Sequence, residues 1–209
     1  FESIMDQGLA LAKWDSFAER AAASQARGLW RGLGIATFLE WTGGNALEEN
    51  VHVQVLPDGV IEVFTAVNAM GQGIATSLAQ LVVDVFGVPL SQVRIVMGDT
   101  DRGNGFGSAG SRSLFTGGSA VSVGSKQALD KAQELAAEAL EAAPQDLRYE
   151  QGSFHVAGTD LKIGLAELAA RQPTQRIEIN SKTAAKGPTW PNGCHVCEVE
   201  LDPDRKSVV

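Results

Sequence analysis

Apolar residues recur along this chain at two spacings, which predict helices and strands in mixed order. From Leu9 to Ala21 they follow a helical spacing, so the pattern predicts one helix over residues 6–27 that ends at Gly28. The segment 30–41 then alternates between larger apolar residues and small or polar ones, which is typical of a strand.

A hairpin, a helix and a further strand are predicted next. Alternating valines over 51–55, a Pro-Asp-Gly turn at 57–59 and a returning strand over 60–67 form the hairpin pattern. An apolar stripe predicts a helix over 73–86, and a strand over 92–97 follows. Because a helical crossover of this length normally returns the chain parallel to its start, this stretch is predicted to be a β-α-β unit.

The rest of the sequence adds a long helix and several short elements. An alanine-rich pattern predicts a helix over 114–142, which Pro144 terminates. The later elements are a hairpin over 147–156, a short helix over 165–170, a strand near Ile177, a strand over 196–201 and a returning strand that starts at 207–209. This order predicts an α+β fold with a mixed β-sheet and packed helices. We expect residues 1–209 to form one domain, with room for a sub-lobe boundary near 143–146.

Composition and charge narrow the classes of function. The 209 residues are 44% hydrophobic and carry a net charge of −8 without a basic face, which argues against a nucleic-acid partner. The longest apolar run, near 81–85, is far shorter than the roughly 20 residues of a membrane span, so none is expected. Two cysteines form no disulfide framework, so the sequence favours a reducing, cytoplasmic location.

The two cysteines, Cys194 and Cys197, have a Cys-x-x-Cys spacing that suggests a redox or zinc site. The surrounding sequence CHVCEVEL has strand character, however, and positions three apart on a strand face opposite sides. No second pair of zinc ligands stands nearby in the sequence. We therefore interpret Cys194 and Cys197 as small buried strand residues, and give His195 the same structural role.

Each strand of the β-α-β unit runs into a glycine-bearing loop that opens a helix. The loops read NAMGQG over 68–73 and GDTDRGNGFGSAGSRS over 98–113. Parallel strands finish at the same edge of a sheet, so both loops and both helix N-termini are predicted to converge where open α/β sheets bind ligands. Helix N-termini attract anions, by roughly 0.3–1 kcal/mol for each exposed placement, and glycine lets a ligand approach the backbone.

The side chains of these loops favour a large polar ligand over a bare metal. Gln72 offers an amide that both donates and accepts, and serines of the second loop add hydroxyls. Two cations, Arg102 and Arg112, stand in the second loop, and the guanidinium fork of Arg112 can reach a phosphate. The combination suits a ligand with phosphate groups and heteroaromatic edges.

Other interpretations of the same residues stay open. Glycines in loops often serve turn geometry alone. Asp99 and Asp101 are more typical of turn residues than of calcium ligands, because the spacing and the closing glutamate of an EF-hand loop are missing. Gly105, Gly107 and Gly110 match G-x-G-x-x-G but begin about eight residues after the strand, too late for a Rossmann fingerprint. A P-loop is absent because the sequence has no Gly-Lys-Ser or Gly-Lys-Thr.

Three longer segments are distinctive: MGQGIATSLAQLVVDVFGVPLSQVRIVMGDTD at 70–101, GSAGSRSLFTGGSAV at 107–121 and WPNGCHVCEVELDPD at 190–204. In this order they resemble the molybdenum-cofactor-binding large subunit of the xanthine oxidase and aerobic carbon monoxide dehydrogenase family. The resemblance covers nearly the whole chain and implies a molybdenum-cofactor-binding-domain-like fold. It also implies that the first segment contacts the pyranopterin and its phosphate and that the second lines the pterin, with Gly110 nearest the metal. The implied cofactor-binding residues are Met70, Gly71, Gln72, Gly73, Ser108, Ala109, Gly110, Ser111, Arg112 and Ser113.

The resemblance implies an activity and partners for a longer parent protein. Molybdopterin, expected as its cytosine dinucleotide, holds the molybdenum in this family without protein ligands. The implied reaction oxidises carbon monoxide, an aldehyde or an N-heterocycle with water as the oxygen source and passes electrons to iron–sulfur and FAD subunits. The family's catalytic glutamate lies beyond residue 209, and its substrate-side loop, with an active cysteine in carbon monoxide dehydrogenases, lies before Phe1. Glu40, Glu48 and Glu49 are expected to be solvated and not to replace that glutamate.

Two functions from different classes follow. The leading hypothesis is a cofactor-cradling piece of a molybdenum hydroxylase, inactive in isolation and expected to lack the cofactor when alone. The alternative is a non-catalytic binding or interaction domain whose glycine loops serve packing, with the helix from Leu114 to Leu140 facing a partner. The returning strand is cut off at Val209, which is typical of a piece of a longer polypeptide.

Overall fold

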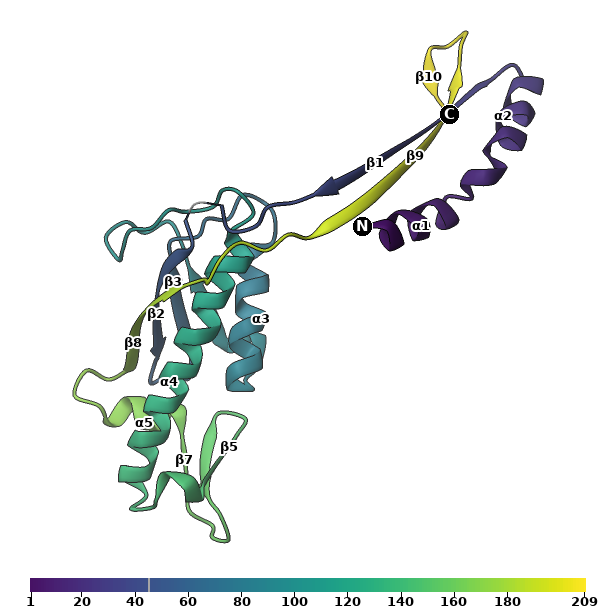
Figure 1. Cartoon of the computed structure of the whole chain (residues 1–209). Coiled ribbons are helices and arrows are strands. Elements are labelled where there is room, and N and C mark those ends of the chain that lie inside the picture. Colours follow the sequence, from purple (N-terminus) through teal and green to yellow (C-terminus); the bar gives the residue numbers. More distant parts are fainter. Residues whose placement is uncertain (45) are drawn as a thin grey trace. The chain divides into compact units, whose positions relative to one another are not determined.

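The computed structural model describes residues 1–44 and 46–209, and the chain divides into two compact units. The first unit combines Phe1–Trp41 with Trp190–Val209, and the second is Thr42–Thr189. Figure 1 labels the helices and strands of both units.

The N-terminal segment of the first unit forms two helices, so the single helix expected over 6–27 is wrong. The elements are α1 (Glu2–Leu11), the 3-10 turn η1 (Trp14–Ser16) and α2 (Phe17–Ala26). The break falls at Lys13, whose backbone is left-handed with φ +51°. The Arg20 guanidinium stabilises it by donating to the carbonyls of Ala12 and Lys13, at 3.2 and 3.0 Å.

The rest of the first unit is a long antiparallel ribbon. Its strands, in the order β1-β9-β10, are β1 (Trp30–Leu39), β9 (Asn192–Asp202) and β10 (Ser207–Val208). Helices α1 and α2 follow this ribbon in Figure 1. Both cysteines of β9 are free. Cys194 is half-buried, whereas His195 and Cys197 are exposed, so the expectation of a buried residue is wrong for His195 and Cys197.

A network of charges fastens α2 to the ribbon. Glu198 of β9 accepts from Arg20 of α2 at 2.6 Å and from Arg31 of β1 at 2.6 Å. Arg31 also reaches Glu200 at 2.8 Å, and the Ser24 hydroxyl donates to Glu200 at 2.6 Å. The hydrogen bonds from Arg20 and then Arg31 lower the pKa of Glu198 from 4.5 to about 2. The network therefore keeps Glu198 ionised in moderately acidic solution.

The second unit is built around a four-stranded mixed sheet in the order β4-β3-β2-β8. Its strands are β2 (Glu48–Val55), β3 (Ile61–Thr65), β4 (Val93–Val96) and β8 (Ile177–Ala184). Strand β2 is antiparallel to β3 and β8, whereas β3 and β4 are parallel. The predicted hairpin, β-α-β unit and α+β class are therefore confirmed.

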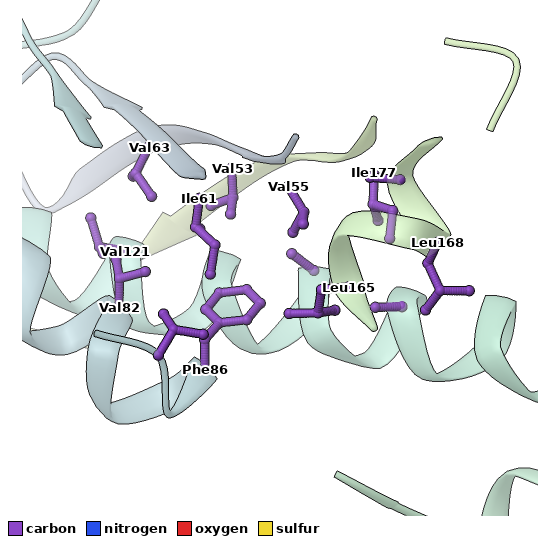
Figure 2. Packing of buried hydrophobic residues seen from close by; sticks show 14 of the residues in the cluster. Val53, Val55, Ile61, Val63, Val82, Phe86, Val121, Leu165, Leu168 and Ile177 are labelled. Atoms are coloured by element: carbon purple, nitrogen blue, oxygen red, sulfur yellow. The ribbon is translucent and has the colours of Figure 1, made fainter. Parts of the chain in front are cut away.

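Two long helices pack side by side on one face of this sheet (Figure 1). They are α3 (Ile74–Phe86) and α4 (Gly118–Ala139), and a π-helical turn, η3 (Ser113–Gly117), leads into α4. Figure 2 shows the buried side chains that join the layers: Val53, Val55, Ile61, Val63, Val82, Phe86, Val121, Leu165, Leu168 and Ile177. The sheet thus has one apolar face, which the alternating valines predict.

A small three-stranded sheet completes the second unit. Its elements are the 3-10 turn η4 (Pro144–Asp146), β5 (Leu147–Glu150), β6 (Ser153–Val156), β7 (Lys162–Gly164) and α5 (Leu165–Arg171). The hairpin over 147–156 and the short helix are confirmed, whereas β7 was not predicted. The sub-lobe boundary near 143–146 stays a prediction. None of the helices in the described residues has both the length and the apolar character needed to cross a membrane.

Two glycines allow α4 and the π-helical turn before it to lie close to β2 and to the loop after β3. A Cβ atom added to Gly124 would lie 2.7 Å from Cγ2 of Val51, and one added to Gly117 would lie 2.5 Å from Cγ2 of Val67. Distances this short leave no room for any side chain. The contact of α4 with β2 therefore depends on Gly124, and the contact of the π-helical turn with the loop after β3 depends on Gly117.

We expect Gly124→Val to lower the free energy of unfolding by about 1–3 kcal/mol, because the added methyl groups overpack the contact with Val51. Urea denaturation followed by far-UV circular dichroism measures the change. Gly187→Val is the matched control, since a Cβ at Gly187 meets nothing within 4 Å. Equal stability of the two variants would contradict the close packing of α4.

We expect Glu198→Gln to reduce the acid sensitivity of the first unit. Because folding lowers the pKa of Glu198 from 4.5 to about 2, its pairing contributes stability above pH 4.5 that is lost as the pH falls toward 2. The urea midpoint should therefore fall less steeply for this variant over that interval. Tryptophan fluorescence reports on the first unit, which holds Trp14, Trp30, Trp41 and Trp190. Exposed Glu19→Gln is the control and should keep the wild-type slope.

Candidate functional site

The parallel pair β3 and β4 brings two loops to one edge of the sheet. The first loop, residues 66–73, follows β3 and opens α3; the second, residues 97–112, follows β4 and opens η3. Residues of both loops and of the helix starts line one pocket: Met70, Gln72, Ile74, Ser77, Ala109, Gly110, Ser111, Ser113 and Leu114. The predicted convergence of the two loops is therefore confirmed.

A single hydroxyl joins the two loops. Ser108 Oγ accepts from the backbone N–H of Asn68 at 2.9 Å and donates to the backbone carbonyl of Asn68 at 2.9 Å. It also accepts from the Ser113 hydroxyl at 2.8 Å. All the hydrogen-bonding capacity of Ser108 is thus used to hold the loops together.

The Gln72 side chain folds back onto its own loop. Its Oε1 accepts from the backbone N–H of Met70 at 2.5 Å, and its Nε2 donates to the carbonyl of Asn68 at 3.1 Å. Gly71 and Gly73 on either side have φ values of +91° and +76°, in the left-handed region that favours glycine. This conformation explains two glycines around one glutamine: the glycines make the turn and the amide closes it.

The described residues that line the pocket are all uncharged. The hydroxyls of Ser77 and Ser113 already donate within the protein, to the Gly73 carbonyl at 3.4 Å and to Ser108 at 2.8 Å, so they can accept from a ligand. The donors open to a ligand are the Ser111 hydroxyl and the N–H groups at the start of α3, which no side chain caps. Ser111 is a non-glycine residue with φ +57°, a costly conformation that persists only where its surroundings enforce it. The pocket can therefore receive an anionic, hydrogen-bonding ligand by neutral donors and the partial positive charge of a helix end.

Glycines at every second position press the second loop against the end of β3. A Cβ atom added to Gly103 would lie 2.9 Å from the Phe64 side chain. One added to Gly105 would lie 2.4 Å from the Ala66 side chain, and one added to Gly107 would lie 3.2 Å from the Asn68 side chain. An extended loop segment therefore runs alongside residues 64–68 with no space for side chains between them. This is the role of Gly105 and Gly107 in the G-x-G-x-x-G match, in agreement with the rejected Rossmann interpretation.

Both arginines of the second loop are turned away from the pocket. Arg102 pairs with Glu62 of β3 at 2.8 Å and lies 5.5 Å from the Phe64 ring centroid. Arg112 is fully buried and its donors face the protein interior, which contradicts the expectation that its fork reaches a phosphate. Glu49, expected to be solvated, is 2% exposed and accepts from Arg112 at 2.8 Å, so that expectation is wrong too.

The remaining sequence-based candidates keep local roles. Asp99 accepts from the backbone N–H of Asp101 at 3.1 Å, which is the turn-forming arrangement. Glu40 and Glu48 are exposed, as expected. Sequence reasoning missed Asn68 and Ser77 as parts of the site. The available signal was position, because Asn68 is the first polar residue after the strand and Ser77 lies one turn into the helix.

The chain is similar to molybdenum-enzyme subunits in sequence and structure. A family model described as a molybdopterin cofactor-binding domain matches residues 7–208. The 6-hydroxypseudooxynicotine dehydrogenase complex subunit gamma of Paenarthrobacter nicotinovorans is 34% identical, over 95% of this chain and 26% of its own length. The carbon monoxide dehydrogenase large chain of Afipia carboxidovorans is 29% identical, over 83% of this chain and 24% of its own length.

A solved structure has the same fold. Quinoline 2-oxidoreductase from Pseudomonas putida 86 superposes with a TM-score of 0.79 at 29% identity, covering 99% of this chain and 29% of that chain. Together with the family match, this similarity confirms the resemblance carried by the three sequence segments. The chain spans about a quarter of the length of the curated relatives it matches.

We expect Gly105→Ala to displace the second loop and lower the free energy of unfolding by about 1–3 kcal/mol, because its methyl group would lie 2.4 Å from Cβ of Ala66. Urea denaturation followed by circular dichroism measures the loss. Asn104→Ala, at the exposed neighbouring position, should stay within about 0.5 kcal/mol of wild type. A Gly105→Ala chain as stable as Asn104→Ala would show that the loop does not depend on this contact.

Proposed function

The chain belongs to the molybdopterin cofactor-binding domain family, and from this premise we propose that its two loops cradle the cofactor in the large subunit of a molybdenum-dependent oxidoreductase. The observation that carries the proposal is the convergence of residues 70–73 and 108–113 on one pocket at the end of two parallel strands. The residues proposed to hold the cofactor, by contact or by shaping the loops, are Met70, Gly71, Gln72, Gly73, Ser108, Ala109, Gly110, Ser111, Arg112 and Ser113.

The chemistry of the pocket fits a phosphorylated pterin. Its hydroxyls and helix N–H groups suit a phosphate, and the Gln72 amide both donates and accepts, as the edge of a pterin requires. Added Cβ atoms at Gly71 and Gly73 would meet nothing within 4 Å, so these glycines leave open space beside the loop. Ser108 and Arg112 act from behind the pocket surface, through the hydrogen bonds that hold the loops.

The bound cofactor would supply the redox chemistry, in which a substrate is oxidised with water as the oxygen source. This chain's part in that reaction is to bind and orient the pterin. We propose the cytosine dinucleotide form, partner subunits with iron–sulfur clusters and FAD, and a cytoplasmic location for the parent. Relatives named for quinoline and for a nicotine-derived compound support an N-heterocyclic substrate, with carbon monoxide and aldehydes as the other candidates.

The alternative, a non-catalytic domain whose glycine loops serve packing, accounts for only part of the structure. Packing explains Gly103, Gly105 and Gly107, which touch the end of β3. Gly71 and Gly73, whose added Cβ atoms would meet no neighbour, are required instead by the left-handed φ values of their turn. Packing also does not account for a pocket lined by serine hydroxyls and the uncapped N–H groups of α3, and this pocket favours the cofactor-binding proposal.

We expect Gln72→Ala in the full-length parent to lower molybdenum and pterin content per polypeptide. Loss of the amide opens the turn at Met70 and removes a partner for the pterin, which weakens binding by about 1–3 kcal/mol. Metal analysis by mass spectrometry and fluorescence of the oxidised pterin measure occupancy. Gln80→Ala, the same substitution at an exposed position on α3, is the matched control. Equal occupancy in the two variants would count against Gln72 as a cofactor-binding residue.

A further inference from the structure

We propose that Arg112 and Glu49 form a buried positioning pair, which fixes the second loop in its pocket-forming shape before any ligand is bound. The identity of the ligand rests on the proposed function, but the holding of the loop does not. Arg112 then acts on the pocket through its neighbours, and the pocket itself recognises an anion by uncharged donors.

The hydrogen bonds of Arg112 reach in two directions. Its Nε donates to the carbonyl of Ala46 at 2.9 Å, and its Nη2 donates to the carbonyl of Glu48 at 2.9 Å and to Glu49 Oε2 at 2.8 Å. Its Nη1 donates to the carbonyl of Gly107. The guanidinium therefore fastens the loop to the start of β2 and also closes residues 107–112 onto themselves.

The neighbours of Arg112 in sequence form the pocket. Ser111, with its left-handed φ of +57°, precedes it, and Ser113, which begins the π-helical turn, follows it. A strained backbone persists only where surrounding contacts over-determine it. The side chain of Arg112 supplies such contacts, because Arg112 lies between the two serines in the chain and its guanidinium is held by three backbone carbonyls and a carboxylate. Its backbone carbonyl also accepts from the N–H groups of Thr116 at 2.7 Å and Gly117 at 3.4 Å, and the bond from Gly117 is the one that starts the π-helical turn.

The pair is poorly optimised for stability alone. Both side chains are completely buried, and Glu49 Oε1 has no hydrogen-bond partner among the described residues. Buried ion pairs often contribute less stability than apolar residues of similar volume, because desolvation of both charges is costly. A Cβ atom on Gly105 would lie 3.3 Å from that free oxygen, so the loop backbone itself covers the carboxylate. Such a pair is better suited to fixing one conformation than to strengthening the core.

The second cation of the loop leads to the same conclusion about recognition. Arg102 pairs with Glu62 at 2.8 Å, so both arginines of the loop are paired with glutamates of the sheet. The pocket-lining residues are uncharged. Its ligand must then be selected by hydrogen-bond geometry, which a loop held in one shape provides.

Hydrogen–deuterium exchange on the full 209-residue chain tests the positioning role. In Arg112→Met, amides of residues 103–113 should exchange at least about tenfold faster, whereas amides of β2 and β3 change much less. Arg112→Lys, which keeps the charge but loses the fork, should restore part of the protection. Val53→Ala is the control for a general loss of stability; it should accelerate exchange in the core strands without singling out the loop.

Two outcomes would overturn the pair. If the exchange rates of the loop and of the core strands rise together in Arg112→Met, as in Val53→Ala, then Arg112 is only a structural core residue. If Arg112→Met does not fold, Glu49→Gln tests the proposal instead, because this variant keeps the three hydrogen bonds from Arg112 to backbone carbonyls. Unchanged loop exchange in a folded Glu49→Gln chain would also contradict the positioning role of the pair.

Cofactor content separates this inference from the proposed function. Molybdenum and pterin per polypeptide are measured for Arg112→Lys and Gln72→Ala in the full-length parent. One possible result is faster loop exchange in Arg112→Lys with full cofactor occupancy in both variants. This result would support the positioning pair in the isolated chain and count against the proposed cofactor site. Lower occupancy in Arg112→Lys, together with faster loop exchange, is the result expected if both are right.

Discussion

The parallel pairing of β3 with β4 is the constraint on which the site depends. Only four residue pairs form it, from Ile61 beside Val93 to Phe64 beside Val96. Helix α3 makes the pairing possible, because its buried residues seat it on the sheet while it carries the chain back to the starting end. Once the two strands run in the same direction, both loops leave from the same edge. The position of the pocket therefore follows from the strand topology and does not depend on the residues of the loops.

Glycine and hydroxyl groups then turn a shared edge into a defined surface. The glycines of the second loop remove the side chains that would separate it from the end of β3, with Gly105 the closest of them. Ser108 ties this loop to Asn68 of the first by donating and accepting at once. Because these contacts use backbone or short side chains, they leave few degrees of freedom. The loops leave a pocket open for a ligand, while the glycine contacts press the second loop against the end of β3.

The parts of this structure that could be predicted from sequence are those with local signals. The hairpin, α3 and the crossover follow from alternation, a turn at Pro57 to Gly59 and an apolar stripe, all within neighbouring residues. The missed features depend on distant partners. The break at Lys13 is held by Arg20, and the burial of Glu49 depends on an arginine 63 positions away. A glutamate at the start of a strand looks solvated until its partner is known, and no spacing rule identifies that partner.

The inward-facing arginines also bear on what the pocket can discriminate. A guanidinium exposed in the pocket would attract any small anion, because Coulomb attraction depends little on the shape of the partner. Here Arg112 and Glu49 together add no net charge behind the pocket, and the remaining attraction comes from helix N–H groups, whose effect falls off within the first turn. Abundant inorganic anions therefore gain little from the site. A large ligand that meets the Gln72 amide, the serine hydroxyls and a helix end at the same time gains from each of them. Selectivity of this kind requires donors that are already in place, so a rigid loop is a condition of recognition.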